Sequence, residues 1–176
     1  MAGSTLHVKV DDARLAIIAN DLNTIPTKVE AAMKSAINRT VKWMQTRARR
    51  ALMTELNIPS KIIRARLRYA LYSVETGRGR VWFGLDPVSV IRLSPKKTKA
   101  GVTARGEQYA HAFIAKGKNG NKHVFVRKGS GRVPLQSVYK DLAAGTDIFE
   151  THVFEGWDEY LYARFEHELK WQKSKT

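Results

Sequence analysis

The sequence predicts an α+β protein in which one long N-terminal amphipathic helix precedes an antiparallel sheet of about five strands, and a C-terminal helix closes the chain. Three observations support this fold. Apolar residues recur at three- and four-residue spacing after Pro26, β-forming residues alternate with turn residues between positions 68 and 127, and a helical apolar pattern returns after residue 153. The 176 residues fit one domain over positions 1–176, with a basic loop or hairpin arm near 94–106.

The long helix is predicted over residues 27–56. Thr27 and Glu30 have the spacing of a capping box, in which the hydroxyl and the carboxylate satisfy backbone N–H groups at the start of a helix. Positions three and four residues apart share a helix face. The residues of the apolar face are Val29, Met33, Ala36, Ile37, Thr40, Met44, Ala48 and Ala51. The opposite face is basic and carries Lys28, Arg39, Lys42, Arg49 and Arg50.

Shorter elements flank this helix. The alternating residues 6–10 predict an edge strand, and the apolar run 15–22 predicts a short helix. Asn57 and Pro59 end the long helix, and residues 60–67 form a second short helix. The basic residues of that second helix are Lys61, Arg64 and Arg66.

Strands follow, and then a final helix. The predicted strands are residues 68–75, 80–85, 88–93, 110–116 and 123–127. A Thr-Gly-Arg-Gly turn at 76–79 joins the first two strands, and residues 134–143 predict one or two turns of helix. The final helix is predicted over 153–173. Its apolar stripe contains Phe154, Trp157, Leu161, Phe165, Leu169 and Gln172.

The charge of the chain is distributed unevenly. The net charge is +15, and residues 28–68 carry 11 Lys/Arg against two acids, a net of +9. Residues 96–132 carry ten against Glu107, again +9, whereas residues 141–168 carry eight acids against Arg164, a net of −7. This asymmetry predicts a polyanionic partner, self-association of acidic on basic surfaces, or both. The alternative is an ordinary solvated basic surface.

Several functional classes are excluded or disfavoured by composition. The chain has no cysteine, which excludes disulfides, zinc ribbons and thiol catalysis. No stretch reaches the roughly 18–20 apolar residues that span a bilayer, and the N-terminus does not resemble a signal peptide. The five histidines lack metal-site spacing, so we expect no metal and no cofactor.

The sharpest enzymatic hypothesis is a metal-dependent nuclease. Asp158 followed by Glu168-Leu-Lys170 superficially matches an acid…ExK pattern, in which two carboxylates hold Mg²⁺ and a lysine assists the attacking water. That chemistry needs Glu and Lys on one face of a strand, whereas here both fall in a predicted helix, about 200° apart. The glycine clusters lack the spacing of a phosphate-binding loop. We therefore predict no enzyme and no catalytic residue.

Basic and aromatic residues remain as candidate contact sites. Candidates for facing nucleic acid or an acidic partner are Lys28, Arg39, Lys42, Arg49, Arg50, Arg64 and Arg66. Candidates for subunit contacts are Lys96, Lys97, Lys99, Arg127, Arg132, Trp157 and Tyr160. For Trp157 and Tyr160 the alternative is docking on the core of the same chain. Trp82 and Phe83 are able in principle to stack bases, but core packing is the stronger expectation for strand aromatics such as Phe113 and Phe125.

Three segments follow one another in a fixed order: His111-Ala-Phe-Ile-Ala, His123-Val-Phe-Val-Arg and Arg132-Val-Pro-Leu-Gln-Ser-Val-Tyr. Together they resemble the minor tail protein Z family of tailed bacteriophages. The upstream long helix, the Pro-Ser-Lys-Ile-Ile-Arg-Ala-Arg-Leu segment from Pro59 and the Val-Trp-Phe-Gly-Leu strand from Val81 also fit, so the resemblance covers roughly residues 20–170. These motifs are structural and carry no active-site residues.

The resemblance implies a structural tail-completion protein at the head-proximal end of a long non-contractile tail. It implies roles in tail maturation, head–tail joining and seating of the DNA end. The expected partners are further copies of the chain, tail terminator or tube proteins, neck or head–tail connector proteins, and phage genomic DNA in the lumen, with no membrane. A closed heterologous interface gives a ring, and the architecture of such tails suggests six-fold symmetry. The expected location is the virion, after assembly in the host cytoplasm. The alternative function is non-specific nucleic-acid binding.

Overall fold

The computed structural model describes residues 3–8, 12–21, 26–73, 78–129 and 131–175. Within these residues the chain is a mixed helical and sheet protein with a C-terminal helix, as predicted. The helices are α1 (Asp12–Asp21), α2 (Pro26–Glu55), α3 (Ser60–Arg66), η1 (Val90–Leu93, a 3-10 turn), α4 (Gly145–Phe154) and α5 (Trp157–Ser174). The strands are β1 (Gly3–Val8), β2 (Leu67–Ser73), β3 (Arg78–Gly84), β4 (Val88–Ser89), β5 (Lys96–Thr98), β6 (Gly101–Ala104), β7 (Glu107–Ala110), β8 (Phe113–Lys116), β9 (Lys122–Arg127), β10 (Leu135–Ser137) and β11 (Tyr139–Lys140).

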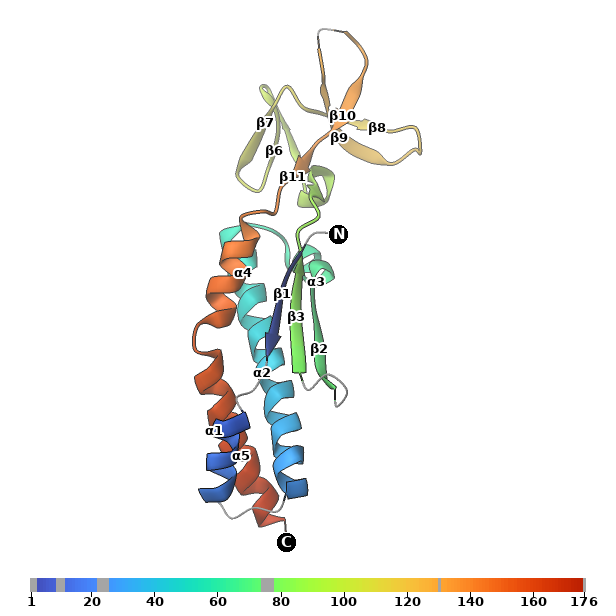
Figure 1. Ribbon diagram of the computed structural model, residues 1–176. Coiled ribbons are helices and arrows are strands. Elements are labelled where there is room, and N and C mark those ends of the chain that lie inside the picture. Colours follow the sequence, from blue (N-terminus) through green and yellow to red (C-terminus); the bar gives the residue numbers. More distant parts are fainter. Residues whose placement is uncertain (1–2, 9–11, 22–25, 74–77, 130, 176) are drawn as a thin grey trace.

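The helix α2 forms the axis of the molecule (Figure 1). Its predicted apolar face is the buried one, because residues at three- and four-residue spacing share a side of the helix. The fully buried residues of α2 are Ala32, Ala36, Ile37, Thr40, Val41, Met44, Ala48 and Leu52. The helix begins at Pro26, where a missing N–H is harmless. Thr27 is therefore already inside the helix and is not the N-cap that a capping box requires, and the position before Pro26 lies outside the described residues.

A small antiparallel sheet covers one side of α2. Its strand order is β1-β3-β2, and Val81 and Phe83 of β3 are buried on its inner face. Gly79 allows the sheet to approach α2, because a Cβ there would lie 2.4 Å from Cγ2 of Val41. The helices α4 and α5 complete the layer around α2, and the three helices run along the long dimension of the molecule (Figure 1). We call this part, α1–α5 with β1–β3, the helical body.

The prediction of a single sheet of about five strands is wrong. The described residues form four small sheets: β1-β3-β2, β5-β6-β7, β10-β9-β8 and the two-stranded β11-β4. Left-handed backbone turns interrupt the predicted strands, because a residue at positive φ lies outside the extended conformation that a strand requires. The predicted strand 110–116 breaks at His111, with φ 56°, and residues 88–93 give only two strand residues before η1. Residues 134–143, predicted as helix, instead contain β10 and β11.

The C-terminal helical segment is two helices. Gly156 adopts a φ of 69° between α4 and α5, a conformation that glycine tolerates and that interrupts a helix. The predicted stripe is correct for Leu161, Phe165 and Leu169, which are buried. It is wrong for Phe154, which ends α4 with its side chain 54% exposed.

The strands β4–β11, residues 88–140, stand beyond the end of the helices that lies opposite the C-terminus (Figure 1), and we call them the distal module. Their own buried residues continue the core out of the helical body. These are Val88, Val90, Leu93, Val102, Ala104, Ala112 and Val124. No helix in the described part of the chain is both long enough and apolar enough to span a membrane.

Candidate assembly surfaces

A buried ion contact joins α2 to α5. Arg39 Nε lies 2.8 Å from Glu168 Oε1, with the arginine side chain 54% exposed and the glutamate side chain only 4% exposed. The N–H of Arg39 is not aligned for a hydrogen bond, and Oε1 of Glu168 has no hydrogen-bond partner within the described residues. The contact is therefore an ion pair that neutralises a buried carboxylate. Arg39, which was predicted to face nucleic acid or an acidic partner, thus forms an ion pair within its own chain.

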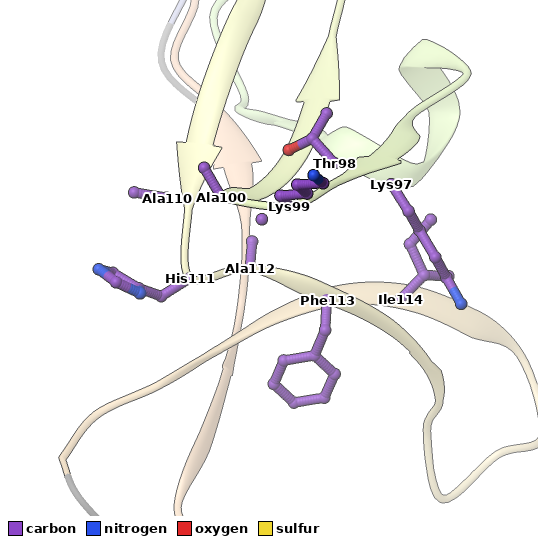
Figure 2. A pocket seen from close by; sticks show the side chains of 10 residues that line it. Lys97, Thr98, Lys99, Ala100, Ala110, His111, Ala112, Phe113 and Ile114 are labelled. Carbon is purple, nitrogen blue, oxygen red and sulfur yellow. The ribbon is translucent and has the colours of Figure 1, made fainter.

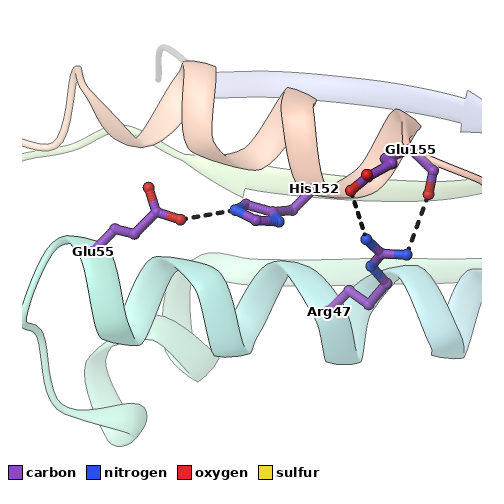
Figure 3. A network of polar contacts seen from close by, with 4 residues as sticks. All are labelled: Arg47, Glu55, His152 and Glu155. Carbon is purple, nitrogen blue, oxygen red and sulfur yellow. Dashed lines mark hydrogen bonds and ion pairs between the residues drawn. The ribbon is translucent and has the colours of Figure 1, made fainter.

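A second polar network joins α2 to α4 and to Glu155, which lies between α4 and α5, and Figure 3 shows its polar contacts. Arg47 donates through Nη2 to Oε2 of Glu155 at 2.9 Å and through Nη1 to the Glu155 carbonyl at 3.3 Å. Its guanidinium also lies 4.8 Å from the centroid of the Trp43 ring. About two turns further along α2, Oε1 of Glu55 lies 2.8 Å from Nε2 of His152 on α4.

Tyr160 belongs to the same seam. Its ring stacks on Trp43, with centroids 4.7 Å apart and planes 11° apart, and its hydroxyl accepts from Arg164 Nε at 3.2 Å. The neighbouring candidate, Trp157, is half-buried against the core. Both aromatic candidates thus contribute to packing inside the chain. Arg47 was missed in the sequence because it stands at the border between the apolar and basic faces of α2.

The seven residues predicted to face nucleic acid or an acidic partner lie on two helices, α2 and α3. Lys42 and Arg50 are exposed on α2, and Lys28 and Arg49 are half-buried on it. Arg64 is exposed on α3. Arg66 donates to the Pro87 carbonyl at 3.2 Å, and burial lowers the pKa of its guanidinium.

The outer face of the sheet β1-β3-β2 carries a basic and aromatic surface, of which Arg66 and Trp82 were named separately from the sequence but Arg68 and Arg80 were not. Trp82 lies opposite Arg68 in the register, and Arg80 is two residues from Trp82 on the same face. The indole lies flat over the paired Gly3 and Gly84: a Cβ on Gly3 would be 2.4 Å from its Nε1, and one on Gly84 would be 2.7 Å from its Cη2. We call Arg66, Arg68, Arg80 and Trp82 the outer sheet face.

Two hollows adjoin Trp82 on this face. One of about 390 Å³ is lined by Thr5, Arg68, Tyr69, Ala70, Arg80 and Trp82. The other, of about 140 Å³, is lined by Ala65, Arg66, Arg68, Trp82, Gly84 and Asp86. Asp86 is the single acid among these lining residues, so the surface is strongly cationic. An alternation of arginine with Trp82 along β3 was the available sequence signal.

The distal module carries the remaining candidates. Lys96 and Lys97 on β5 and Lys99 in the turn after it are exposed. Figure 2 shows the hollow of about 480 Å³ between this turn and residues 110–114, with Phe113 and His111 pointing away from Thr98. The residues lining it include no carboxylate, so they do not form an acid–base or metal-binding constellation.

The side chain of Arg127 binds the backbone of Arg132 in the β9–β10 hairpin. Arg127 Nη1 donates to the Arg132 carbonyl at 2.7 Å, and its guanidinium lies 5.3 Å from the centroid of the Phe113 ring. The exposed apolar residues nearby in sequence are Val133, Leu135 and Tyr139. The β9–β10 hairpin therefore combines basic side chains with exposed apolar side chains, a composition found at protein contacts.

Polar contacts among Lys140, Glu107 and Tyr109, which we call the polar clasp, join β11 to β7 in the distal module. Lys140 on β11 pairs with Oε1 of Glu107 on β7, and the Tyr109 hydroxyl donates to Oε2 of Glu107 at 2.6 Å. Burial alone would raise the pKa of Glu107, but the hydrogen bonds from Lys140 and Tyr109 and the lysine charge outweigh it, so this pKa falls below its ordinary value of 4.5. Burial, followed by the hydrogen bond and charge of Glu107, raises the pKa of Tyr109.

The residues of the nuclease-like pattern do not converge. Glu168 is buried against Arg39, and Lys170 Nζ bonds Oε1 of Glu166 at 2.6 Å. No group of three or more His, Asp or Glu side chains able to hold a metal ion occurs among the described residues. The side chains that the fold organises serve packing, charge pairing and surface contact.

The fold and these surfaces define an α+β protein whose ordered polar groups make contacts between elements. The family model of prophage minor tail protein Z matches residues 15–174, and the chain belongs to this family. It is a phage tail protein with a structural role in the virion. The predicted family membership is thus confirmed. No curated protein and no solved structure matches the chain.

Proposed function

We propose that the chain is a tail-completion protein at the head-proximal end of a long non-contractile tail. There it takes part in tail maturation, in head–tail joining and in seating the DNA end. The observation that carries the proposal is the match to a structural tail family over residues 15–174. Contact surfaces on both the helical body and the distal module support it, because a protein that joins two assemblies needs more than one surface.

We propose a homo-oligomeric ring, with six copies suggested by the architecture of such tails. A ring around DNA needs basic groups toward its lumen, and exposed Lys42 and Arg50 on α2 supply such groups. The distal module, with Lys96, Lys97 and Lys99 exposed, reaches tail terminator, tube or neck proteins. In this proposal the whole chain is one domain with a basic arm, and it performs no catalysis and needs no cofactor.

The test is a phage in which the gene for this chain is deleted and then supplied in trans. We expect tails of normal length that fail to join heads productively, with infectivity restored by the wild-type chain. Labelled protein should lie at the head-proximal end of purified tails. Fully infectious particles without the chain would overturn the proposal.

The alternative, a free nucleic-acid-binding protein, rests on the net charge of +15. It predicts tight, salt-sensitive binding of duplex DNA by monomers and no incorporation into tails. Quantifying the chain in purified virions separates the two functions.

A further inference from the structure

Among the described residues, the outer sheet face carries arginines without a counter-charge and an indole without apolar cover. Neither Arg68 nor Arg80 has an ion-pair partner within the part of the chain that the structure describes, and the half-buried indole of Trp82 lies flat beside two open hollows. An arginine gains from a carboxylate, and an exposed indole face gains from apolar cover. The occupant of this face should therefore be acidic and carry an apolar side chain.

The helix α4 presents that combination on its solvent side. Asp147, Glu150, Thr151 and Phe154 follow one another at helical spacing and are all exposed, while Phe149 and Val153 point into the core. Among the described residues, neither Asp147 nor Glu150 has an ion-pair partner, and Glu150 only accepts a hydrogen bond from Ser4 Oγ at 2.8 Å. We call these four exposed residues the α4 stripe.

We infer that the α4 stripe of one copy docks on the outer sheet face of a second copy. The spacings agree: Glu150 and Phe154 are one helical turn apart, about 6 Å, and Arg80 and Trp82 are two strand residues apart, about 7 Å. A phenyl ring over the indole thus places a carboxylate beside an arginine. The inference rests on the proposed homo-oligomer and names the two surfaces that build it.

Charge and chemistry favour a second copy over duplex DNA on this face. Duplex DNA offers phosphates to Arg68 and Arg80, but its bases are stacked inside and would leave the indole of Trp82 uncovered. The α4 stripe supplies both the acid and the ring. Because the two surfaces are different, the contact is heterologous, and repeating it gives a closed ring or an open filament.

Cysteine cross-linking tests the contact directly, since the chain has no cysteine of its own. Ala70→Cys places a thiol on β2 opposite Arg80, and Thr151→Cys places one within the α4 stripe, both at exposed positions. Mixing the two purified single variants with a short bismaleimide should give a covalent dimer. The double variant should give a ladder of higher oligomers. The matched control pairs Ala70→Cys with Ala163→Cys, an exposed site on α5 outside the stripe.

A dimer yield no higher than that of the control pair would overturn the inference. So would efficient cross-linking of Ala70→Cys with itself, because that result shows a contact between two sheet faces. Cross-linking of the mixed pair several-fold above the control supports it.

Charge reversal gives an independent test. The variant Arg68→Glu/Arg80→Glu should weaken self-association by at least roughly 100-fold, because like charges then face each other. Adding Asp147→Lys/Glu150→Lys to the same chain should restore association, with folding of each variant checked by circular dichroism. If the arginine variant loses duplex DNA binding but cross-links normally, the face is a DNA surface and the inference is wrong.

These outcomes are separable from those of the proposed function. Failure of the cross-link in a chain still needed for infectious tails removes only the interface. A specific cross-link in a chain that infectious particles lack removes only the tail-completion role.

Discussion

The helical body and the distal module use charge in different ways. In the helical body, basic residues of α2 meet acids of the C-terminal segment: Arg39 meets Glu168 on α5, and Arg47 meets Glu155 at the junction between α4 and α5. In the distal module, residues 96–132 carry ten Lys/Arg against the single acid Glu107, which is held by Lys140. The comparison shows that the net charge of +15 comes from basic residues in two different settings. Part of it is paired inside the chain, and part is exposed on the surface.

The largest expected effect comes from the core shared by α2 and α5. Phe165→Ala should lower the free energy of unfolding by about 3–5 kcal/mol, because Phe165 is fully buried and its removal leaves a cavity. Phe154→Ala, at an exposed site, should change it by no more than about 0.5 kcal/mol in dilute solution. Urea unfolding of both variants checks this. Equal losses would contradict the burial of Phe165 and the exposure of Phe154.

A smaller effect is expected at the buried ion pair. Arg39→Ala leaves the Glu168 carboxylate without its counter-charge, and because Arg39 is half exposed we expect a loss of about 1–2 kcal/mol. Lys42→Ala, which removes an exposed charge from the same helix, is the matched control and should be nearly neutral. Indistinguishable urea midpoints for the two variants would show that Arg39 does not neutralise the Glu168 carboxylate.

Arg47→Ala tests the contact between α2 and the junction of α4 with α5. It removes the bond to Glu155 and the contact with the Trp43 ring, for a loss of about 1 kcal/mol. Because Arg47 lies beside the Trp43 ring, tryptophan fluorescence should change as well. A double-mutant cycle with Glu155→Ala should show coupling, whereas a cycle with Glu159→Ala should not. Additive losses in the first cycle would contradict the ion pair.

The smallest effect is expected in the distal module and depends on pH. The pKa of Glu107 is lower in the folded chain than its ordinary value of 4.5, so its contribution to stability is complete above that value and is lost as the pH falls through the folded pKa. Glu107→Gln should therefore cost about 0.5–1 kcal/mol near neutral pH and nothing in strongly acidic solution. Urea unfolding across this pH range is the measurement, and a difference independent of pH would rule out the ionised clasp.

The helices were largely predictable from the sequence, and the sheets were not. The face of α2 that contains Ile37 and Met44 follows from a spacing that only a helix satisfies. The split of one expected sheet into four depends on positive φ at residues such as Ser94 and His111, which no local signal requires because neither residue is glycine. Phe154 was misassigned because the break at Gly156 resets the helical phase.

Which side chains pair within the chain was harder to predict than the helices, for a physical reason. Charge and exposure can be expected from composition, but pairing depends on which elements meet. The sequence did not predict that Arg39 pairs with Glu168 or that Tyr160 stacks on Trp43. Their contacts with other molecules stay a prediction. Trp82 was weighed for base stacking, yet its flat setting over Gly3 and Gly84 requires a strand register that the sequence does not specify.

The most direct test of the central claim is an electron-microscopy reconstruction of the assembled tail that resolves side chains at its head-proximal end. The claim predicts a symmetric ring of this chain there, with Arg39 and Glu168 paired inside each copy and the outer sheet face of each copy against the α4 stripe of the next. A tail end without this chain, or with copies that do not touch through these two faces, would contradict it.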